Sequence, residues 1–193
     1  TESYDLSSLR YIMSGAAPLP SEIRRLTQEK TGCLTFMGYG LTETSPLTHM
    51  NPIDEEMVKE NSIGPPVSDL EQKVVDLETG ERDMPLGEIG ELALKGPQVM
   101  KGYWNAPEET ARVLRDGWFL TGDIVRIDED GYVYIVDRLK EMIKYKGFSV
   151  APAELESLLH QHPQVADAAV IPKADDEAGE IPKAFIVLKD GEK

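Results

Sequence analysis

The sequence predicts a mixed fold: the end of an α/β region, then a β-rich region resembling a distorted barrel, then a small α+β domain. Three observations predict it. An apolar run, an amphipathic run and a second apolar run follow one another over residues 9–38, which is a strand–helix–strand order. Short apolar runs separated by turn residues fill residues 62–136. After residue 137, an amphipathic run precedes two further apolar runs.

The first region begins with LRYIM at residues 9–13, which predicts a short buried strand. The segment SEIRRLTQEKTG at 21–32 predicts a helix, since Ile23 and Leu26 share one helical face. Gly32 is a typical residue for the end of that helix.

A second strand is predicted at LTFMG, residues 34–38, so two glycine-bearing segments each follow a strand. They are SGAAPLP at 14–20 and GYGLTETSP at 38–46. Ligands of open α/β sheets bind just beyond the strand ends. Both segments are therefore candidates for a binding site.

The β-rich region contains four predicted strands, at residues 72–77, 88–94, 123–127 and 132–136. The last two are joined through DEDG at 128–131, which predicts a hairpin. Only PEETARVLR at 107–115 indicates a helix here, with proline at its start and Glu108 and Glu109 in its first turn.

The carboxyl-terminal region begins after Asp137, and we place the domain boundary at residues 137–140. APAELESLLHQH at 151–162 predicts an amphipathic helix, with Glu154 and Glu156 in its first turn. Its apolar face consists of Leu155, Leu158 and Leu159. Two strands follow, at residues 165–171 and 184–188, which makes this region α+β. The expected domains are therefore 1–138, divided into 1–60 (α/β) and 61–138 (β-rich), and an incomplete domain at 139–193.

Composition excludes several functions. Lys and Arg number 20 against 35 Asp and Glu, a net charge of −15, so neither nucleic acid nor an anionic membrane is an expected partner. Cys33 is the single cysteine, which excludes a disulfide framework. We see no apolar run long enough to cross a membrane and no signal peptide, so we expect a cytoplasmic protein, or a peroxisomal one. The chain starts without methionine, and we expect it to be a piece of a longer protein.

The chemistry of the segment 38–46 suits a nucleotide. Glycine at a strand end lets backbone N–H groups approach a phosphate. Thr42 offers a hydroxyl donor, Glu43 an oxygen ligand for Mg²⁺, and Tyr39 a ring on which a base could stack. No Walker lysine or dinucleotide-binding glycine pattern occurs. From the residues alone, an ordinary turn and a nucleotide cradle are equally good interpretations.

Two further segments carry candidate groups. Asp123, in WFLTGD, could chelate two ribose hydroxyls, although an aspartate that caps a turn is the commoner case. Arg138 and Lys140, in a locally basic stretch, could reach a ribose or a phosphate. A solvated basic surface is the alternative for that stretch.

Five segments together resemble the adenylate-forming superfamily of acyl-CoA synthetases, 4-coumarate–CoA ligases and firefly-type luciferases. They occur in the order and at about the intervals seen there: SGAAPLP, GYGLTET, GELALKGPQVMKGYWN, DGWFLTGD and DRLKEMIKYKGFSVAPAELE. The resemblance covers nearly the whole chain. It favours the nucleotide cradle over the ordinary turn.

The resemblance implies an ATP-dependent acid–CoA ligase of the fatty-acyl or 4-coumarate type, which uses Mg²⁺, ATP, CoA and a carboxylic acid. By that likeness Gly15, Ala16 and Ala17 line the adenine and acid pockets, and Gly38, Tyr39 and Gly40 hold the adenine. Thr42 contacts phosphate and Glu43 binds Mg²⁺. The ribose side is implied to contain Asp123, Ile135 and Arg138.

For the second half-reaction, the resemblance implies that Lys140 is a hinge for the small domain. Lys144 is then catalytic in thioester formation, and Lys146, Gly147 and Phe148 contact CoA. Gly147 would leave room for the pantetheine arm.

The departures from the family pattern are two. The family's phosphate loop and its terminal catalytic lysine are both missing from this sequence, so we expect the chain alone to be inactive. Three alternatives remain open: an adenylation domain that loads a carrier protein, a luciferase-like oxidation, and a binding module without catalysis.

Overall fold

The structure is a computed structural model that describes residues 4–16 and 19–189. The chain divides into two compact units. The first extends to Thr121 and includes Val125–Ile135, and the second comprises Gly122–Ile124 and the described residues from Val136 onward. Each unit has its own sheet structure.

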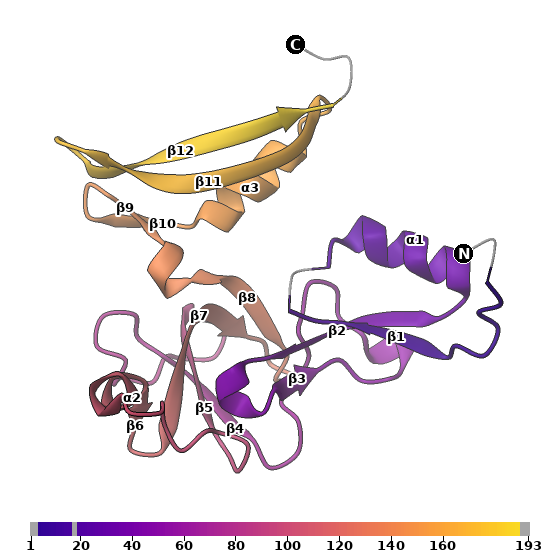
Figure 1. Cartoon of the computed structure of the whole chain (residues 1–193), viewed down its shortest axis with the longest axis horizontal. Helices are drawn as coiled ribbons and strands as arrows, with labels where there is room; N and C mark the ends of the chain where they lie inside the picture. The colour runs from indigo at the N-terminus through magenta and orange to yellow at the C-terminus, as the bar shows by residue number, and fades with distance from the viewer. Residues whose placement is uncertain (1–3, 17–18, 190–193) are drawn as a thin grey trace. The chain divides into compact units, whose positions relative to one another are not determined.

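The first unit opens with the predicted strand–helix–strand order, formed by β1 (Tyr11–Ser14), α1 (Ser21–Thr31) and β2 (Leu34–Gly40) (Figure 1). β1 and β2 are parallel, and β3 (Leu47–Met50) pairs antiparallel with β2. Gly32 ends α1 in the left-handed conformation, with φ 68°, because only glycine adopts it without strain. The predicted α/β arrangement is confirmed.

The prediction that residues 9–13 form a buried strand is wrong about burial. Tyr11 and Met13 in β1 are half exposed, whereas Phe36 in β2 is 1% exposed. β1 is the edge of a three-stranded sheet and β2 is its centre, so β2 has a neighbour on both sides. α1 forms as predicted, although none of its residues is buried.

The glycine segment 38–46 begins inside a strand, not after one. Gly38 and Gly40 belong to β2 because β3 pairs with this stretch, and a register shift separates Tyr39 from Gly40. A short 3₁₀ helix, η1 (Thr42–Thr44), follows. The backbone therefore leaves the sheet two residues later than the sequence indicates.

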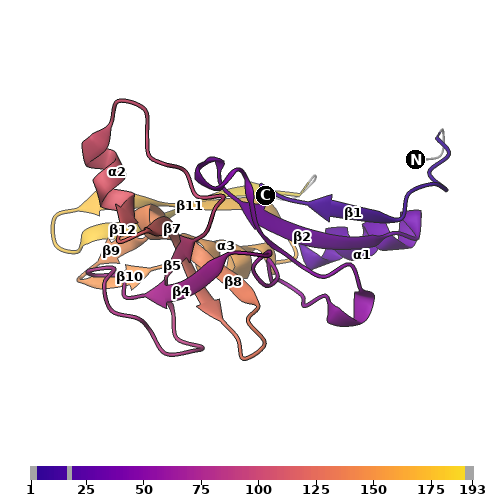
Figure 2. The same ribbon diagram turned by 90° about the horizontal axis from the view of Figure 1, so that it is seen from below.

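The β-rich part of the chain is a five-stranded sheet in the order β4-β5-β7-β6, with β8 paired to β7. Its strands are β4 (Glu71–Val75), β5 (Gly90–Lys95), β6 (Leu114–Arg115), β7 (Trp118–Ile127) and β8 (Val133–Arg138). The helix α2 (Pro107–Val113) starts with proline as predicted and lies outside this sheet (Figure 2). A second 3₁₀ helix, η2 (Glu55–Met57), precedes β4.

One face of this sheet holds the main core. Eight buried residues form it: Ile63, Leu70, Val74, Leu92, Leu94, Val125, Ile127 and Val133. The predicted hairpin between β7 and β8 is present, and Gly131 at φ 83° donates its N–H to the Asp128 carbonyl at 3.0 Å. The sequence placed Asp123 at a strand start, which is wrong, because β7 runs without a break from Trp118 through Asp123.

The second unit contains a four-stranded sheet in the order β10-β9-β12-β11. Its elements are η3 (Leu139–Glu141), β9 (Ile143–Tyr145), β10 (Phe148–Val150), α3 (Pro152–His160), β11 (Val165–Asp175) and β12 (Gly179–Leu188). α3 packs against β11 (Figure 1). Glu156 lies beyond the first turn of α3, contrary to prediction, and its carboxylate accepts the Val170 N–H at 2.7 Å.

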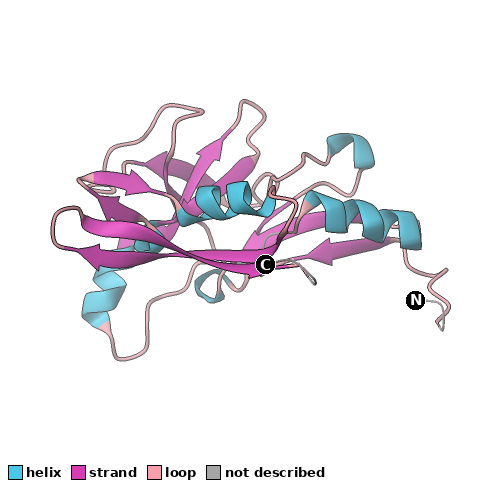
Figure 3. Cartoon of the chain, turned by 90° about the horizontal axis from the view of Figure 1, so that it is seen from above, coloured by secondary structure: helices cyan, strands magenta, loops and turns pink. Residues whose placement is uncertain are grey.

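Strands dominate both units, and the sheets are curled, with few helices (Figure 3). The predicted mixed fold class is thereby confirmed. Within residues 4–16 and 19–189, we find no helix with the length and apolar character needed to cross a bilayer.

Candidate functional site

The two glycine segments meet at the carboxyl ends of parallel strands. Ser14 of β1 is paired with Met37 of β2, and a Cβ built on Gly15 would lie 3.3 Å from the Gly38 carbonyl oxygen. Ala16 follows with φ 69°, a conformation that favours glycine. Strained backbone of this kind clusters at ligand sites. Ala17 lies outside the described residues.

Gly40 is required by a close approach of backbone to backbone. A Cβ at this position would lie 1.8 Å from the Pro46 carbonyl oxygen, which is far inside contact distance. The same oxygen accepts the Leu41 N–H at 3.0 Å. This contact closes the turn 41–46 on itself and sets where Thr42 and Glu43 leave the strand.

Tyr39 is partly buried and packs against the main core. Its ring lies 5.7 Å from the ring of buried His49, and its carbonyl accepts the Thr48 hydroxyl at 3.2 Å. Burial lowers the pKa of His49 to about 4, so this imidazole is neutral at pH 7. Tyr39 therefore packs against a buried, uncharged imidazole.

Thr42 and Glu43 stand at the start of η1, with Thr42 exposed and Glu43 half-buried. The Glu43 carboxylate accepts the Tyr103 hydroxyl at 2.8 Å, and its backbone carbonyl accepts the Met100 N–H at 2.7 Å. Partial burial and this hydrogen bond raise the pKa of Tyr103, so its hydroxyl stays a donor. Glu43 is thus a carboxylate held in place at a strand end.

The described residues could supply only part of the coordination shell of Mg²⁺, and the nucleotide phosphates would supply the rest. No group of three or more His, Cys, Asp or Glu gathers among the described residues. Mg²⁺ in nucleotide sites uses one or two carboxylates and completes its shell with phosphate oxygens and water. Glu43, with one oxygen engaged by Tyr103, has lone pairs left for one such bond.

The second unit holds the other acidic candidate. Asp123 is 3% exposed, and its carboxylate forms an ion pair with the Arg138 guanidinium at 3.1 Å. A buried carboxylate needs such a partner because desolvation disfavours its charge. Asp137, which immediately precedes Arg138, accepts the Ala153 N–H of α3 at 3.3 Å. The structure therefore joins Asp123 and Arg138, two of the three residues that the family resemblance assigned to the ribose.

The remaining predicted residues lie on the surface of their units. Ile135, of the first unit, is 41% exposed, and Lys140, in η3, is exposed. Lys144 of β9 donates its N–H to Glu180 and its ammonium to the Ser149 hydroxyl, each at 2.7 Å.

Lys146 and Gly147 form the two-residue turn between β9 and β10. Both have positive φ, 49° and 85°, as a type I′ hairpin turn requires. A Cβ on Gly147 would meet no atom of the described residues within 4 Å, and Phe148 beside it is 73% exposed. This turn is open to solvent.

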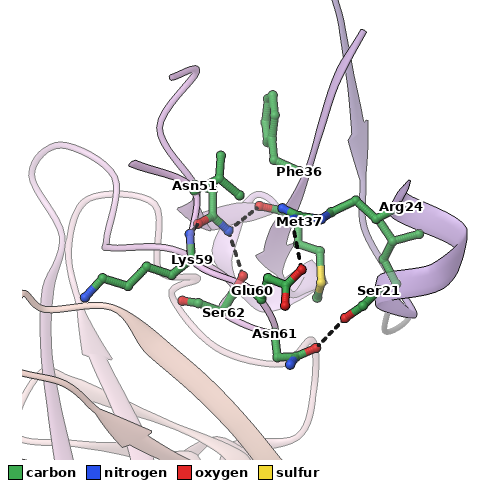
Figure 4. A pocket seen from close by; sticks show the side chains of 11 residues that line it. Ser21, Arg24, Phe36, Met37, Asn51, Lys59, Glu60, Asn61 and Ser62 are labelled. Carbon is green, nitrogen blue, oxygen red and sulfur yellow. Dashed lines mark hydrogen bonds and ion pairs between the residues drawn. The ribbon is translucent and has the colours of Figure 1, made fainter. Parts of the chain in front are cut away.

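A cavity in the first unit is lined by none of these residues. It has a volume of about 10 Å³, the space of one water, and is lined by α1, β2 and the loop 58–62. Figure 4 shows the Asn51 amide pointing into it, where it donates to the Ser62 carbonyl at 2.6 Å. Arg24 and Glu60 form an ion pair at its edge. These contacts anchor the loop and leave no room for a ligand.

Tyr103 is a site residue that sequence analysis missed. It lies in GELALKGPQVMKGYWN, residues 90–105, which carried the family resemblance but received no role. The presence of this segment among those that resemble the family was the one sequence feature that could have pointed to Tyr103. The residue that Tyr103 would serve could not be inferred, since Glu43 lies 60 positions away in the chain.

Comparison with known proteins identifies what this chain resembles. The family described as AMP-binding enzyme matches residues 1–104, and its C-terminal domain matches residues 154–193. A 4-coumarate–CoA ligase of Pinus taeda is 50% identical over 95% of this chain and 35% of its own length. The chain thus spans about a third of that relative.

Solved structures show the same likeness. ATP-bound MatB from Rhodopseudomonas palustris matches 94% of this chain, and 36% of its own, with a TM-score of 0.86 and 40% identity. The anthranilate CoA ligase AuaEII, in complex with anthranoyl-AMP, matches 98% of this chain and 36% of its own, with a TM-score of 0.82 and 36% identity.

Proposed function

Because the chain belongs to the AMP-binding enzyme family, we propose that it is the carboxyl-terminal part of an ATP-dependent acid–CoA ligase. In the first half-reaction a carboxylate oxygen attacks the α-phosphate of ATP, which forms an acyl-adenylate and releases pyrophosphate. In the second, the CoA thiol attacks the acyl carbon and AMP leaves. The substrate class is an aromatic acid of the 4-coumarate type or a fatty acid, and the name of the Pinus taeda ligase supports the first of these.

One observation carries this proposal. Gly15 and Gly38 meet at the carboxyl end of a parallel strand pair, and a fixed carboxylate, Glu43, follows within one turn. This is where open α/β sheets bind ligands, and glycine lets the backbone approach a nucleotide closely.

We assign the adenylation roles on this basis. Gly15, Ala16 and Ala17 line the adenine and acid pockets, and Gly38, Tyr39 and Gly40 flank the adenine. The Thr42 hydroxyl donates to a phosphate oxygen. Asp123 accepts from the ribose hydroxyls, with Ile135 and Arg138 beside the same nucleotide.

Glu43 would hold Mg²⁺ together with the phosphates. When bound, Mg²⁺ neutralises charge on the phosphate oxygens. Glu43 itself would supply the negative charge that orients the ion.

For thioester formation we assign Lys140 as the hinge between residues 1–138 and 139–193. Lys144 acts in this step, and the open turn of Lys146, Gly147 and Phe148 contacts CoA. The exposure of that turn supports the assignment, because the anionic CoA needs an accessible basic surface in an otherwise acidic chain.

The test is acid-dependent ATP–pyrophosphate exchange by the full-length protein with a panel of aromatic and fatty acids, followed by CoA thioester detection. We expect both signals with one class of acid. Exchange with transfer only to a carrier-protein thiol would favour a carrier-loading domain. No exchange with any acid would favour a binding module. The 193-residue chain alone should show no exchange.

A further inference from the structure

Tyr103 makes a contact that the assigned roles do not yet explain. Its hydroxyl donates to Glu43 Oε1 at 2.8 Å, across 60 positions of sequence. The ring is 38% exposed, so burial of this side chain is not the main reason for its position. The hydrogen bond to Glu43 is the specific interaction that the side chain makes.

The loop that carries Tyr103 is fixed on both sides of the contact. Upstream, Met100 donates its N–H to the Glu43 carbonyl at 2.7 Å. At Tyr103 itself, the backbone N–H donates to the Thr110 hydroxyl of α2 at 2.9 Å, and that hydroxyl donates to the Ala106 carbonyl at 2.8 Å. The Tyr103 hydroxyl is therefore presented from a braced backbone.

Gly102 makes this bracing possible. Its φ is 146°, and a Cβ there would lie 2.8 Å from Thr110 Cγ2, inside contact distance. Only glycine lets the chain pass Thr110 closely enough for the Tyr103 N–H to reach the hydroxyl. In the segment MKGYW, the glycine is thus required by the nearby Thr110, and the tyrosine makes its hydrogen bond to the distant Glu43.

A braced donor changes what Glu43 can do. A free glutamate samples several side-chain rotamers, and binding a metal must order them at a cost in entropy. A hydrogen bond to Oε1 orders the side chain in advance, and a carboxylate keeps enough lone pairs to bind an ion as well. Among the described residues, Oε2 of Glu43 accepts no hydrogen bond.

We propose that Tyr103 is a positioning residue that pre-orients the Glu43 carboxylate for Mg²⁺ in the Mg²⁺–ATP complex. This inference rests on the proposed function, since it needs Glu43 to be the metal ligand. It gives the 90–105 motif a role in the same site as the 38–46 motif. The hydrogen bonds of Tyr103 and Met100 to Glu43 join the two motifs.

The test is calorimetric titration of the full-length protein with ATP, with and without Mg²⁺. The variants are Tyr103→Phe, Glu43→Gln and the double variant. Tyr103→Phe should weaken Mg²⁺–ATP binding about tenfold, the usual value of a hydrogen bond to a charged group, and leave ATP binding without Mg²⁺ unchanged. In the Glu43→Gln background, Tyr103→Phe should add no further loss to the Mg²⁺-dependent part.

Tyr134→Phe is the matched control. The Tyr134 hydroxyl also donates to a carboxylate, Asp128 Oδ2 at 3.1 Å, in the same unit but outside the assigned site. Its removal should leave the Mg²⁺-dependent part of ATP binding unchanged. If it weakens that part as much as Tyr103→Phe does, the effect is one of general stability and the inference is wrong.

The outcomes separate the two levels of the proposal. If Glu43→Gln leaves Mg²⁺–ATP binding unchanged, the metal assignment of the proposed function fails. If Glu43→Gln weakens it and Tyr103→Phe does not, the metal assignment stands and the positioning role is wrong. Equal loss for ATP with and without Mg²⁺ in Tyr103→Phe would also overturn the positioning role, because the loop would then be merely structural.

Discussion

Two glycine turns, at Gly40 and at Gly147, differ in why they need glycine. At Gly40, in the first unit, a side chain would collide with the Pro46 carbonyl oxygen at 1.8 Å. At Gly147, in the second unit, a side chain would meet nothing within 4 Å among the described residues, and the requirement is the φ of 85°. One glycine keeps space for the neighbouring backbone, and the other sets the path of an open turn.

The difference extends to the surroundings of each turn. The Gly40 turn holds Glu43 through Tyr103 and rests on buried His49, so its geometry exists before any ligand arrives. The Gly147 turn exposes Lys146 and Phe148 and is fixed mainly by its hairpin. A prebuilt site suits electrostatic stabilisation of a reacting phosphate, whereas an open one suits capture of a long flexible substrate.

The largest expected effect separates the two glycines by stability. Gly40→Ala should lower the local free energy of opening of β2 and β3 by about 3 kcal/mol, because the backbone must move. Gly147→Ala should cost the β9–β10 hairpin about 1 kcal/mol, the strain of a left-handed alanine. Amide hydrogen exchange measures each region by itself. Equal losses at the two positions would remove the distinction.

The next effect concerns the dry support of the first turn. The pKa of His49 is lowered to about 4 by burial, whereas an unfolded histidine titrates near 6.5. Between these values only the unfolded state binds the proton, so stability is complete above pH 6.5 and falls by roughly 3 kcal/mol towards pH 4. His49→Gln should abolish this slope in the first unit, as denaturation at several pH values would reveal.

His160 in the second unit gives the opposite sign. It is exposed, and its ring nitrogens donate to two acceptors, the Glu156 carbonyl and the Asp167 carboxylate, which raise its pKa. Its contribution is present below pH 6.5 and is lost as the pH rises through the folded pKa. An NMR titration should find the two histidines on opposite sides of 6.5. Titration of both histidines near pH 6.5 would contradict the contrast between a buried His49 and a solvent-exposed His160.

Glu43→Gln tests the chemistry assigned to the prebuilt turn. Glutamine keeps the shape and can still accept from Tyr103, but it removes the charge that we assign to Mg²⁺. Adenylation in the full-length protein should slow about a hundredfold, or roughly 2.7 kcal/mol in transition-state stabilisation. Pyrophosphate release at limiting Mg²⁺ measures it. An unchanged rate would mean that Glu43 has no part in metal binding.

Lys140→Pro gives the smallest expected effect and tests the hinge. Proline fixes φ near −65° and restricts Leu139 before it, so a required rotation at η3 would be hindered. We expect about a tenfold loss of thioester formation with adenylation largely kept. Lys140→Ala, which removes the charge without stiffening the chain, should lose much less. If alanine is as harmful as proline, the ammonium group matters and the pivot does not.

Most elements were predictable because their signals are local. The apolar spacing of 21–32, its terminal Gly32 and the 128–131 turn each act within a few residues, and each formed as expected. The exposure of β1 was not predictable, since it depends on which strands pair with it. The same holds for β2, which extends to Gly40 only because β3 pairs there.

The candidate site shows the same limit. Glycine, hydroxyl and carboxylate chemistry pointed to Gly38, Thr42 and Glu43 from the sequence. The contact of Tyr103 with Glu43 joins two strongly separated segments, and no local pattern encodes it. The ion pair of Asp123 with Arg138 was likewise hidden, because each residue was interpreted as a separate ligand to the nucleotide.

The contrast between the two turns is tested most directly by measuring the half-reactions separately in the full-length protein for Glu43→Gln and Gly147→Leu, with Gly147→Ala as the control for backbone strain. Glu43→Gln should slow pyrophosphate release about a hundredfold and leave thioester formation from preformed acyl-adenylate within about twofold. Gly147→Leu should do the reverse, and Gly147→Ala should change both steps far less than leucine does. If Glu43→Gln and Gly147→Leu each slow both half-reactions equally, the two turns do not serve different steps, and the division of labour proposed for this chain is wrong.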